Sequence, residues 1–390
     1  SSSTHESEVK VNGYQRTEST IARKGLLHVK GEEGLLRINA NNIAVSGADI
    51  LNDGQGQTYL SAKNNLNLST VAIGFAEQMG GGNHYRNESS QTAVVSRVSG
   101  NGDVTLSAKN IYSEGAELAS EERLALLAEN ELVLGTATQQ HEYEEYHKYK
   151  SRNIVSSSTK ESYSSQDSLQ HKGTVLGAKD IVLSATNMTL SATEAVALNN
   201  ITAIAKENFV VDGAVNQSHQ NEWEKRKQRG LTASAANGIA SVGIGRSKSG
   251  TNEDTANTRL QLSRFNALGN LTFVAEDGDL TLNAAQLQSG NDMHVQGKNV
   301  YLNALTENES RHVSHYARSA GIGVNMVYNP KQVFKDNFGE QANQGSAVGI
   351  VGKIFTTAEA AGKTTNQVFT PGGVYGHSQR SRLEKEGTQS

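Results

Sequence analysis

An apolar pattern that returns about every twenty residues constrains this chain more than any other feature. The segment 104–108 (VTLSA) alternates apolar and polar residues, and the segment 124–128 (LALLA) repeats the pattern twenty positions later. The same interval relates Leu282 to Leu302, and it aligns Phe273 with Met293. A period of two is typical of a β-strand with one buried face, so we expect short strands throughout.

Each repeat consists of apolar-x-apolar-x-Ala, a short polar break that often contains Asn, and a second apolar-x-apolar segment. Two or three strands per repeat predict an all-β fold, a right-handed parallel β-helix with about twenty residues per coil. Small Ala residues suit the tight corners of such a coil. Asn at a corner tolerates left-handed backbone and bonds to its neighbours in the coils above and below. A β-sandwich also fits short strands and turns, but the regular interval favours the β-helix.

Long polar stretches interrupt the repeats at about 76–96, 139–172, 217–264 and 307–328, and each places His near an aromatic residue, as in HEYEEYHKYK. A coil only a few side chains across cannot bury them, so we predict polar β-hairpin arms that project from the coils. The opening THESEVKVNGYQRTES and the closing GHSQRSRLEKEG resemble the same element. We therefore expect one repeat array over 1–329, cut from a longer one, and an atypical tail over 330–390.

The composition agrees with a stack of thin layers. The chain has 390 residues, of which 36% are hydrophobic and 5% aromatic, and its mean hydropathy is −0.52. These values are too apolar for wholesale disorder and too poor in large side chains for one compact core. Cys is absent, which excludes disulfides and Cys-ligated metal sites. The net charge of −4 gives no global attraction for nucleic acid, and no nucleic-acid partner is expected.

Sequence signatures of enzymes are missing. The chain contains no phosphate-binding loop in its strand–turn–helix context, no Gly-x-Ser-x-Gly elbow and no His-Glu-x-x-His. His312 and His315 have a spacing seen in zinc sites, but they lie between basic residues without a nearby acid. We expect no catalytic residue, no cofactor and no metal. A carbohydrate-active β-helix enzyme is the enzymatic alternative, and it would need acids clustered on one face of the coils.

The arms are the parts that we expect to touch a partner. The basic run EKRKQRG at 224–230 follows Trp223, a combination that can bind phosphate groups of nucleic acid or lipopolysaccharide. The alternative is a solvated hairpin edge, on which Lys and Arg discourage pairing with other chains. The candidate interaction residues are His141, Tyr143, Tyr146, His147, Tyr149, Trp223, Lys225, Arg226, Lys227, Arg229, His315 and Tyr316.

Two Gly/Ala-rich stretches, 230–245 and 319–328, follow basic and aromatic runs and alternate apolar with small residues. They are candidates for contact with lipid. The alternative is that each is the return strand of an arm and packs on its own hairpin.

The phrases LSAKNI, GADI, GAEL and LNAAQLQSGNDM, alternating with His-containing arms over about 4–329, resemble the filamentous haemagglutinin repeat family. The likeness is greatest to the second haemagglutinin repeat block of contact-dependent growth inhibition effectors. The resemblance implies a bacterial protein that crosses the periplasm and is secreted to the cell surface through an outer-membrane two-partner secretion transporter. It also implies a non-enzymatic stalk that engages the target outer membrane, its lipopolysaccharide or a surface receptor and aids toxin delivery. The alternative is an adhesin shaft that binds cell surfaces.

Overall fold

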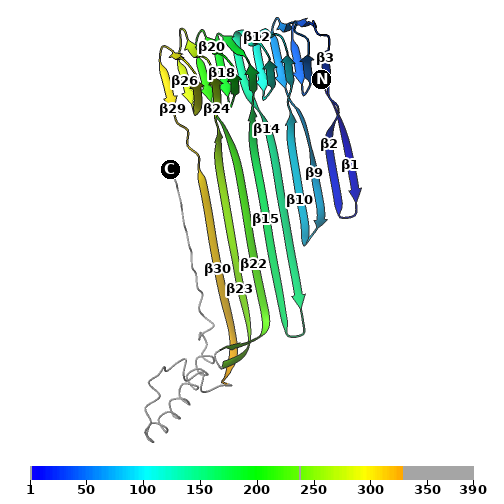
Figure 1. The fold of residues 1–390 in the computed structure, drawn as a ribbon. Coiled ribbons are helices and arrows are strands. Elements are labelled where there is room, and N and C mark those ends of the chain that lie inside the picture. Colours follow the sequence, from blue (N-terminus) through cyan, green and yellow to red (C-terminus); the bar gives the residue numbers. More distant parts are fainter. Residues whose placement is uncertain (1, 237–238, 328–390) are drawn as a thin grey trace.

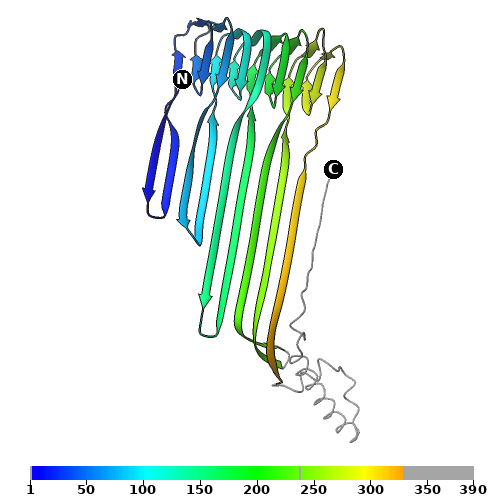
Figure 2. The same ribbon diagram turned by 180° about the vertical axis from the view of Figure 1, so that it is seen from behind.

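The computed structural model describes residues 2–236 and 239–327, and these residues form strands and turns without a helix (Figure 1). The all-β prediction is thereby confirmed for the described chain. One part is a stack of short coils, and the other is a set of long arms that extend from one side of the stack (Figures 1 and 2). The tail at 330–390 lies outside the described residues, as does the closing segment GHSQRSRLEKEG.

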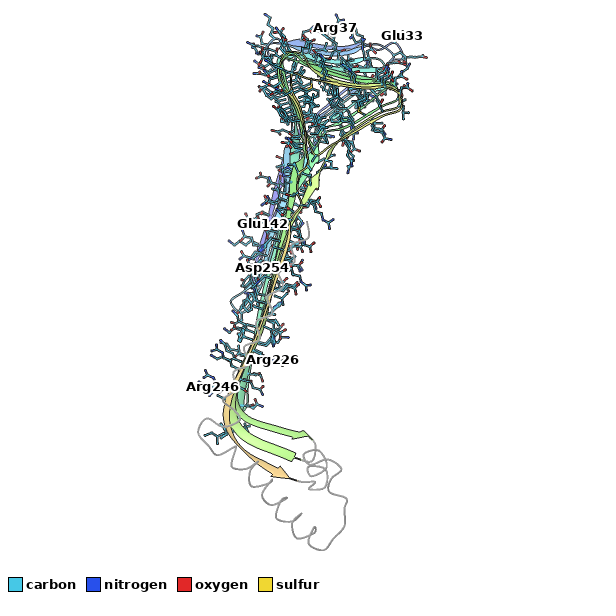
Figure 3. The ribbon with its side chains drawn as sticks, turned by 90° about the vertical axis from the view of Figure 1, so that its left-hand side faces the viewer. Glu33, Arg37, Glu142, Arg226, Arg246 and Asp254 are labelled. Atoms are coloured by element: carbon cyan, nitrogen blue, oxygen red, sulfur yellow. The ribbon has the colours of Figure 1, made fainter. Side chains whose placement is uncertain are left out.

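Each coil contains three short strands, one on each side of a three-sided cross-section (Figure 3). On every side, a strand pairs in parallel with the equivalent strand of the next coil. Val104 pairs with Leu124 and Leu282 with Leu302, so the predicted twenty-residue interval is confirmed at these positions. The alignment of Phe273 with Met293 is wrong, because Phe273 pairs with Val295 and this coil is two residues longer.

The first side comprises β4 (Leu36–Ala40), β7 (Thr58–Ala62), the first part of β12 (Val104–Glu114), the first part of β14 (Arg123–Arg152), β17 (Asp180–Ala185), β20 (Ile201–Ala205), β25 (Leu271–Ala275) and β28 (Met293–Gln296). The second side comprises β5 (Ile43–Ser46), β8 (Asn65–Ser69), the next parts of β12 and β14, β18 (Asn187–Ser191), β21 (Phe209–Asp212), β26 (Leu280–Asn283) and β29 (Val300–Asn303). The third side comprises β3 (Leu26–Val29), β6 (Asp49–Asn52), β11 (Arg97–Gly100), β13 (Glu117–Ser120), β16 (Val175–Ala178), β19 (Glu194–Ala197), β24 (Ser263–Ala267) and β27 (Ala285–Ser289).

The interior of the stack is a narrow apolar core. Inward positions of successive coils place Leu, Ile and Val above one another, and Phe273 packs between Phe209 and Phe265 with ring centroids 5.0 and 4.9 Å apart. The predicted role of small corner residues is confirmed by a column of buried Ala. Its members are Ala62, Ala108, Ala128, Ala185, Ala205 and Ala275.

Asparagines at the corners bond from coil to coil, as predicted. The side chain of Asn110 donates to Asn65 Oδ1 at 3.0 Å, and that of Asn303 donates to Asn283 Oδ1 at 2.8 Å. The expected left-handed backbone at Asn is wrong for the described residues. Positive φ there is found only at glycines and at Ala192 and Ala284.

The arms are hairpins, and one leaves the stack after every second coil. They comprise β1 (Ser3–Val11) with β2 (Tyr14–Arg23), β9 (Val71–Gly81) with β10 (His84–Val94), the outer part of β14 with β15 (Ser156–Gly173), β22 (Ala214–Ala236) with β23 (Ile239–Gln261), and the single strand β30 (Glu309–Val327). The hairpins become longer from the N-terminal to the C-terminal end of the stack (Figure 1).

The predicted hairpins project from the coils (Figure 1), but they are not separate from one another, which the sequence analysis did not anticipate. Strand β2 pairs with β9, β10 with β14, β15 with β22, and β23 with β30, all antiparallel. The arms therefore form one continuous antiparallel sheet, and the long strand β14 belongs both to this sheet and to the parallel coils. The parallel pairing predicted for the coils is found there, and the arms are antiparallel, as expected for hairpins.

All arms leave from the same corner of the coils, and two local features stabilise the chain there. At alternate coils the corner is closed by a residue with positive φ, namely Gly47 (53°), Gly115 (63°), Ala192 (47°) or Ala284 (48°). At the other coils an arm replaces this turn. Where an arm returns to the stack, a fully buried hydroxyl bonds back to the strand that led into the arm. Ser96 donates to Ser69 O at 2.8 Å, and Ser263 donates to Asp212 O at 2.6 Å.

Replacement of Gly115 by Ala should destabilise the corner. The residue has a left-handed φ of 63°, and a Cβ atom would lie 2.5 Å from Lys172 O and 2.9 Å from Ala137 N at the base of an arm. Strain of this kind costs about 1–3 kcal/mol, so we expect a lower midpoint of urea unfolding. The matched control is Gly177→Ala in β16, where a Cβ atom would meet nothing within 4 Å. Equal midpoints for the two variants would contradict this account of the corner.

Candidate functional site

The sheet of arms is a single layer with both faces open to solvent, as its edge-on view shows (Figure 3). Successive side chains of a strand point to opposite faces, and directly paired residues share a face. The register therefore assigns every arm residue to one of two faces. We call the face that carries Tyr146, Tyr163 and Trp223 the tryptophan face, and the other the opposite face.

The predicted interaction residues are divided between the two faces. The register places Tyr146, Trp223, Lys225, Lys227, Arg229 and Tyr316 on the tryptophan face. It places His141, Tyr143, His147, Tyr149, Arg226 and His315 on the opposite face. The basic run 224–230 is therefore not one cluster, because alternate residues of a strand cannot act on the same partner surface.

A row of aromatic side chains crosses four strands of the tryptophan face. Tyr85, Tyr146, Tyr163 and Trp223 are paired in register from β10 to β22. Trp223 is stacked on Tyr163 with ring centroids 5.6 Å apart, and Tyr146 is 5.5 Å from Tyr85. Burial in this row and a hydrogen bond to Glu144 raise the pKa of Tyr85 to about 12, so its hydroxyl remains a donor.

Three rows of cations follow the aromatic row toward the tips of the arms. Four strands contribute them, and the only carboxylate that the register places among them is Glu161, which pairs with Lys148 at 2.6 Å. The hydrogen bond from Lys148 lowers the pKa of Glu161, and the nearby charges of Lys227 and Lys225 lower it further. The cations are Lys148, Lys150, Arg152, Lys225, Lys227, Arg229, Arg246, Lys248 and Arg318.

Several of these cations lie directly opposite one another on neighbouring strands, where a sheet is more stable with opposite charges or uncharged residues. Lys248 lies directly opposite Lys227 on one side and Arg318 on the other, and Arg229 lies opposite Arg246. Like charges in direct cross-strand pairs destabilise a sheet. Within the described residues, only Lys148 of this set forms an ion pair, and Lys225 lies over the Trp223 ring at 4.1 Å. The local arrangement thus favours an anion that is not part of the described chain.

An exposed apolar row lies next to the cations on the same face. Leu231, Ile244 and Ile322 pair across β22, β23 and β30 and are 43%, 70% and 71% exposed. The two Gly/Ala-rich stretches singled out in the sequence meet here, since β23 pairs with both β22 and β30 through this region. Residue 328 of the second stretch lies outside the described residues.

A row of glycines lies beside the apolar row, where β22, β23 and β30 bend away from the sheet below Arg246 (Figure 3). Gly230, Gly245 and Gly321 are paired in register across these strands. A Cβ atom on Gly321 would lie 2.8 Å from Gly245 Cα, and one on Gly230 would lie 2.2 Å from Val155 O. The close approach of the backbones therefore requires glycine in this row.

The opposite face carries a histidine cluster and few charges near the tips. The Nδ1 atoms of His84 and His147 are 3.2 Å apart, and His147 Nε2 contacts Glu145 Oε1 at 2.7 Å. Beside the cation rows, this face carries Lys160 and Arg226, and Lys160 is paired with Glu224 at 3.2 Å. In the described part of the chain, no group of three or more His, Asp or Glu side chains is placed to hold a metal ion.

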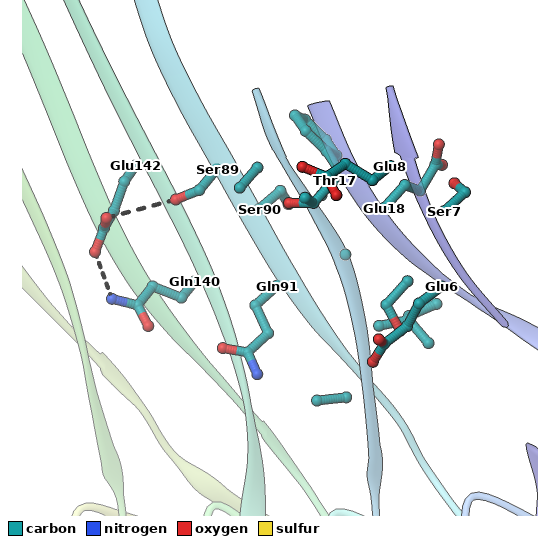
Figure 4. A pocket seen from close by; sticks show the side chains of 16 residues that line it. Glu6, Ser7, Glu8, Thr17, Glu18, Ser89, Ser90, Gln91, Gln140 and Glu142 are labelled. Atoms are coloured by element: carbon teal, nitrogen blue, oxygen red, sulfur yellow. Dashed lines mark hydrogen bonds between the residues drawn. The ribbon is translucent and has the colours of Figure 1, made fainter. Parts of the chain in front are cut away.

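Acidic residues gather closer to the coils, so charge is separated along the arms. Glu142 and Asp254 lie nearer the stack than Arg226 and Arg246 (Figure 3). A polar concavity on the first arms has carboxylates as its only charged lining groups, and Gln140 donates to Glu142 there at 2.8 Å (Figure 4). The charged groups that line this concavity would repel an anion.

The sequence analysis missed six of the nine cations on this surface. Lys148, Lys150 and Arg152 come from β14, Arg246 and Lys248 from β23, and Arg318 from β30, far apart in the chain. The period-two spacing of Lys148, Lys150 and Arg152 was the available signal. It indicates three cations on one face of a strand, but only the register between hairpins shows that they join Lys225, Lys227 and Arg229.

The family comparison matches this chain to the model described as Hemagglutinin repeat over residues 78–154, 155–268 and 244–367. The chain belongs to the hemagglutinin repeat family. Proteins of this family are secreted surface proteins, and the family is structural and adhesive rather than typically enzymatic. No curated protein and no solved structure matches the chain significantly. Over residues 2–236 and 239–327, no helix has the length and hydropathy needed to cross a membrane.

One contact between the arms of this hemagglutinin repeat protein should depend on pH. His219 in β22 contacts Asp254 at 2.6 Å and Asp167 at 3.1 Å, which joins three strands on the tryptophan face. Hydrogen bonding to Asp254, and then to Asp167, raises the pKa of His219 above its ordinary value. The stabilisation is therefore complete below the ordinary histidine pKa of about 6.5 and is lost as the pH rises through the higher folded value.

We expect the His219 imidazole to titrate by NMR at a higher pH than histidine in the urea-unfolded chain. The signal is assigned by its loss in His219→Gln. The Asp254→Asn variant should lower the titration midpoint because it removes the principal partner. A midpoint that is unchanged in Asp254→Asn would show that the contact is not formed.

Proposed function

We propose that this chain is a stalk segment of a large secreted bacterial surface protein, and that its arms contact the outer membrane of a neighbouring cell. The observation that carries the proposal is the sheet of arms that extends from one side of the stack. Near its tips, this sheet carries cations and the exposed side chains of Leu231, Ile244 and Ile322. A shaft that only separates two domains would not need a long sheet ending in exposed apolar groups.

The more specific role that we propose is delivery, as in contact-dependent growth inhibition effectors. In this role the full-length protein leaves its own cell through an outer-membrane two-partner secretion transporter and helps a toxin enter the target cell. The support is the likeness of the coils and arms to those effectors, together with a tip suited to a membrane surface. We also propose that the coils wind as a right-handed β-helix, since connections between parallel strands are right-handed in about 98% of cases.

An adhesin shaft is the second candidate, and membership of the hemagglutinin repeat family favours it. In that case the arms bind a protein or glycan receptor on the cell surface, and the apolar tip is not the contacting part. The two candidates differ in whether binding depends on the tip.

Deletion of residues 231–244 tests this difference. It removes Leu231 and Ile244 and leaves Ile322 of β30 without its partner. Gly230 and Gly245 are directly paired, so the deletion joins them into a two-residue Gly-Gly hairpin turn between Arg229 and Arg246. The shortened hairpin then ends close to the level of β14 and β15, since Ser156 pairs with Gly230. We expect the deletion to weaken binding of the labelled segment to bacteria with an outer membrane by about tenfold or more.

Circular dichroism should show that the shortened protein keeps its β structure. Binding is measured by flow cytometry over a range of protein concentrations. If the intact and shortened segments bind the cells equally, the tip is not the contact and the adhesin shaft is supported. If neither segment binds, the proposed contact with a neighbouring outer membrane is wrong.

A further inference from the structure

We propose that the tryptophan face binds a phosphorylated glycolipid, whose sugars lie along the aromatic row, phosphates along the cation rows and acyl chains at the apolar row. This inference rests on the proposed function and names the chemistry of the partner. It comes from the order of the rows, which runs from aromatic to cationic to apolar along the same strands.

The three kinds of row lie at different distances along the strands of this face. Trp223 and Leu231 are separated by eight positions of β22, which correspond to roughly 25 Å along an extended strand. Lys225, Lys227 and Arg229 occupy the alternate positions between them on the same face. An amphiphile with a sugar part, a phosphate part and an acyl part presents the same sequence of chemistry along its length.

The cation rows need an anionic partner. Lys227, Lys248 and Arg318 form a line of direct neighbours across three strands, so their mutual repulsion opposes the native register. Phosphates spaced across a membrane surface would relieve this repulsion, and Arg and Lys bind phosphate by charge-assisted hydrogen bonds. A second copy of this face would bring cations against cations, so charge disfavours self-association.

The apolar row distinguishes a lipid from a soluble anion. Ile244 and Ile322 are 70% and 71% exposed, and no described side chain covers them. Single-stranded nucleic acid could use the aromatic and cationic rows, but it would leave the apolar row in water. Amphipathic surfaces with Lys and Arg next to exposed aliphatic groups bind the interface of anionic membranes.

The test measures binding of the full chain to phosphatidylcholine vesicles that contain a bis-phosphorylated glucosamine glycolipid. Parallel vesicles contain the same glycolipid without its phosphates, or phosphatidylglycerol at equal charge. The test variant is Lys225→Gln with Lys227→Gln. The matched control is Lys160→Gln with Arg226→Gln, a directly paired set in β15 and β22 that removes two charges at the same level of the sheet but from the opposite face.

We expect the intact protein to bind the phosphorylated glycolipid more tightly than phosphatidylglycerol and to bind the dephosphorylated glycolipid weakly. The double variant of Lys225 and Lys227 should bind about thirtyfold more weakly, and the control should change by less than about threefold. Equal losses in the two variants would overturn the assignment to the tryptophan face. Equal binding to phosphatidylglycerol vesicles, or stronger binding to a single-stranded oligonucleotide, would overturn the assignment of a glycolipid as the partner.

Failure of this inference can be told apart from failure of the proposed function. If the intact segment binds cells in a tip-dependent way but does not bind glycolipid vesicles, the contact with the outer membrane stands and its glycolipid partner is wrong. If the segment binds neither cells nor vesicles, both are overturned.

Discussion

The arrangement of this protein depends on a match between two β-sheet spacings. Neighbouring strands lie about 4.8 Å apart, and this distance is both the rise of one coil and half the width of a two-stranded hairpin. One hairpin per two coils therefore fills the available height, and each arm meets the next at hydrogen-bonding distance. The pairings β2–β9, β10–β14, β15–β22 and β23–β30 follow from this match. An arm on every coil would be too crowded, and one on every third coil would leave gaps.

The match explains how a sheet without a hydrophobic core can be ordered. The arms have solvent on both faces, so main-chain hydrogen bonds and cross-strand contacts must hold them, as in the stack of Tyr163 on Trp223 and the bridge from His219 to Asp167 and Asp254. The coil stack sets the register at the base of each arm through buried hydroxyls such as Ser96 and Ser263. The two faces can then carry different kinds of side chain, and the tryptophan face carries the aromatic, cationic and apolar rows.

Much of the coil could be predicted from the sequence, because its strands alternate with a period of two and its corners repeat. The pairing of Val104 with Leu124 and the Asn110–Asn65 bond follow from that pattern. The mistaken alignment of Phe273 shows the limit, since a corner can gain two residues without changing the face of any side chain. The joining of the arms was missed because it depends on the spacing of the coils in space. The cationic surface was missed because it combines four strands, and a single strand such as 224–230 contributes to both faces.

The most direct test of the shared sheet is a disulfide cross-link between two neighbouring hairpins, in a chain that has no Cys of its own. Ser168 of β15 and Ser218 of β22 are directly paired and share the opposite face. A chain with Cys at both positions should form an intramolecular disulfide under mild oxidation. A chain with Cys at 168 and 217 should not, because these side chains point to different faces. If neither chain cross-links, or if both do so equally, the arms are independent hairpins and the match between coil rise and hairpin width does not join them.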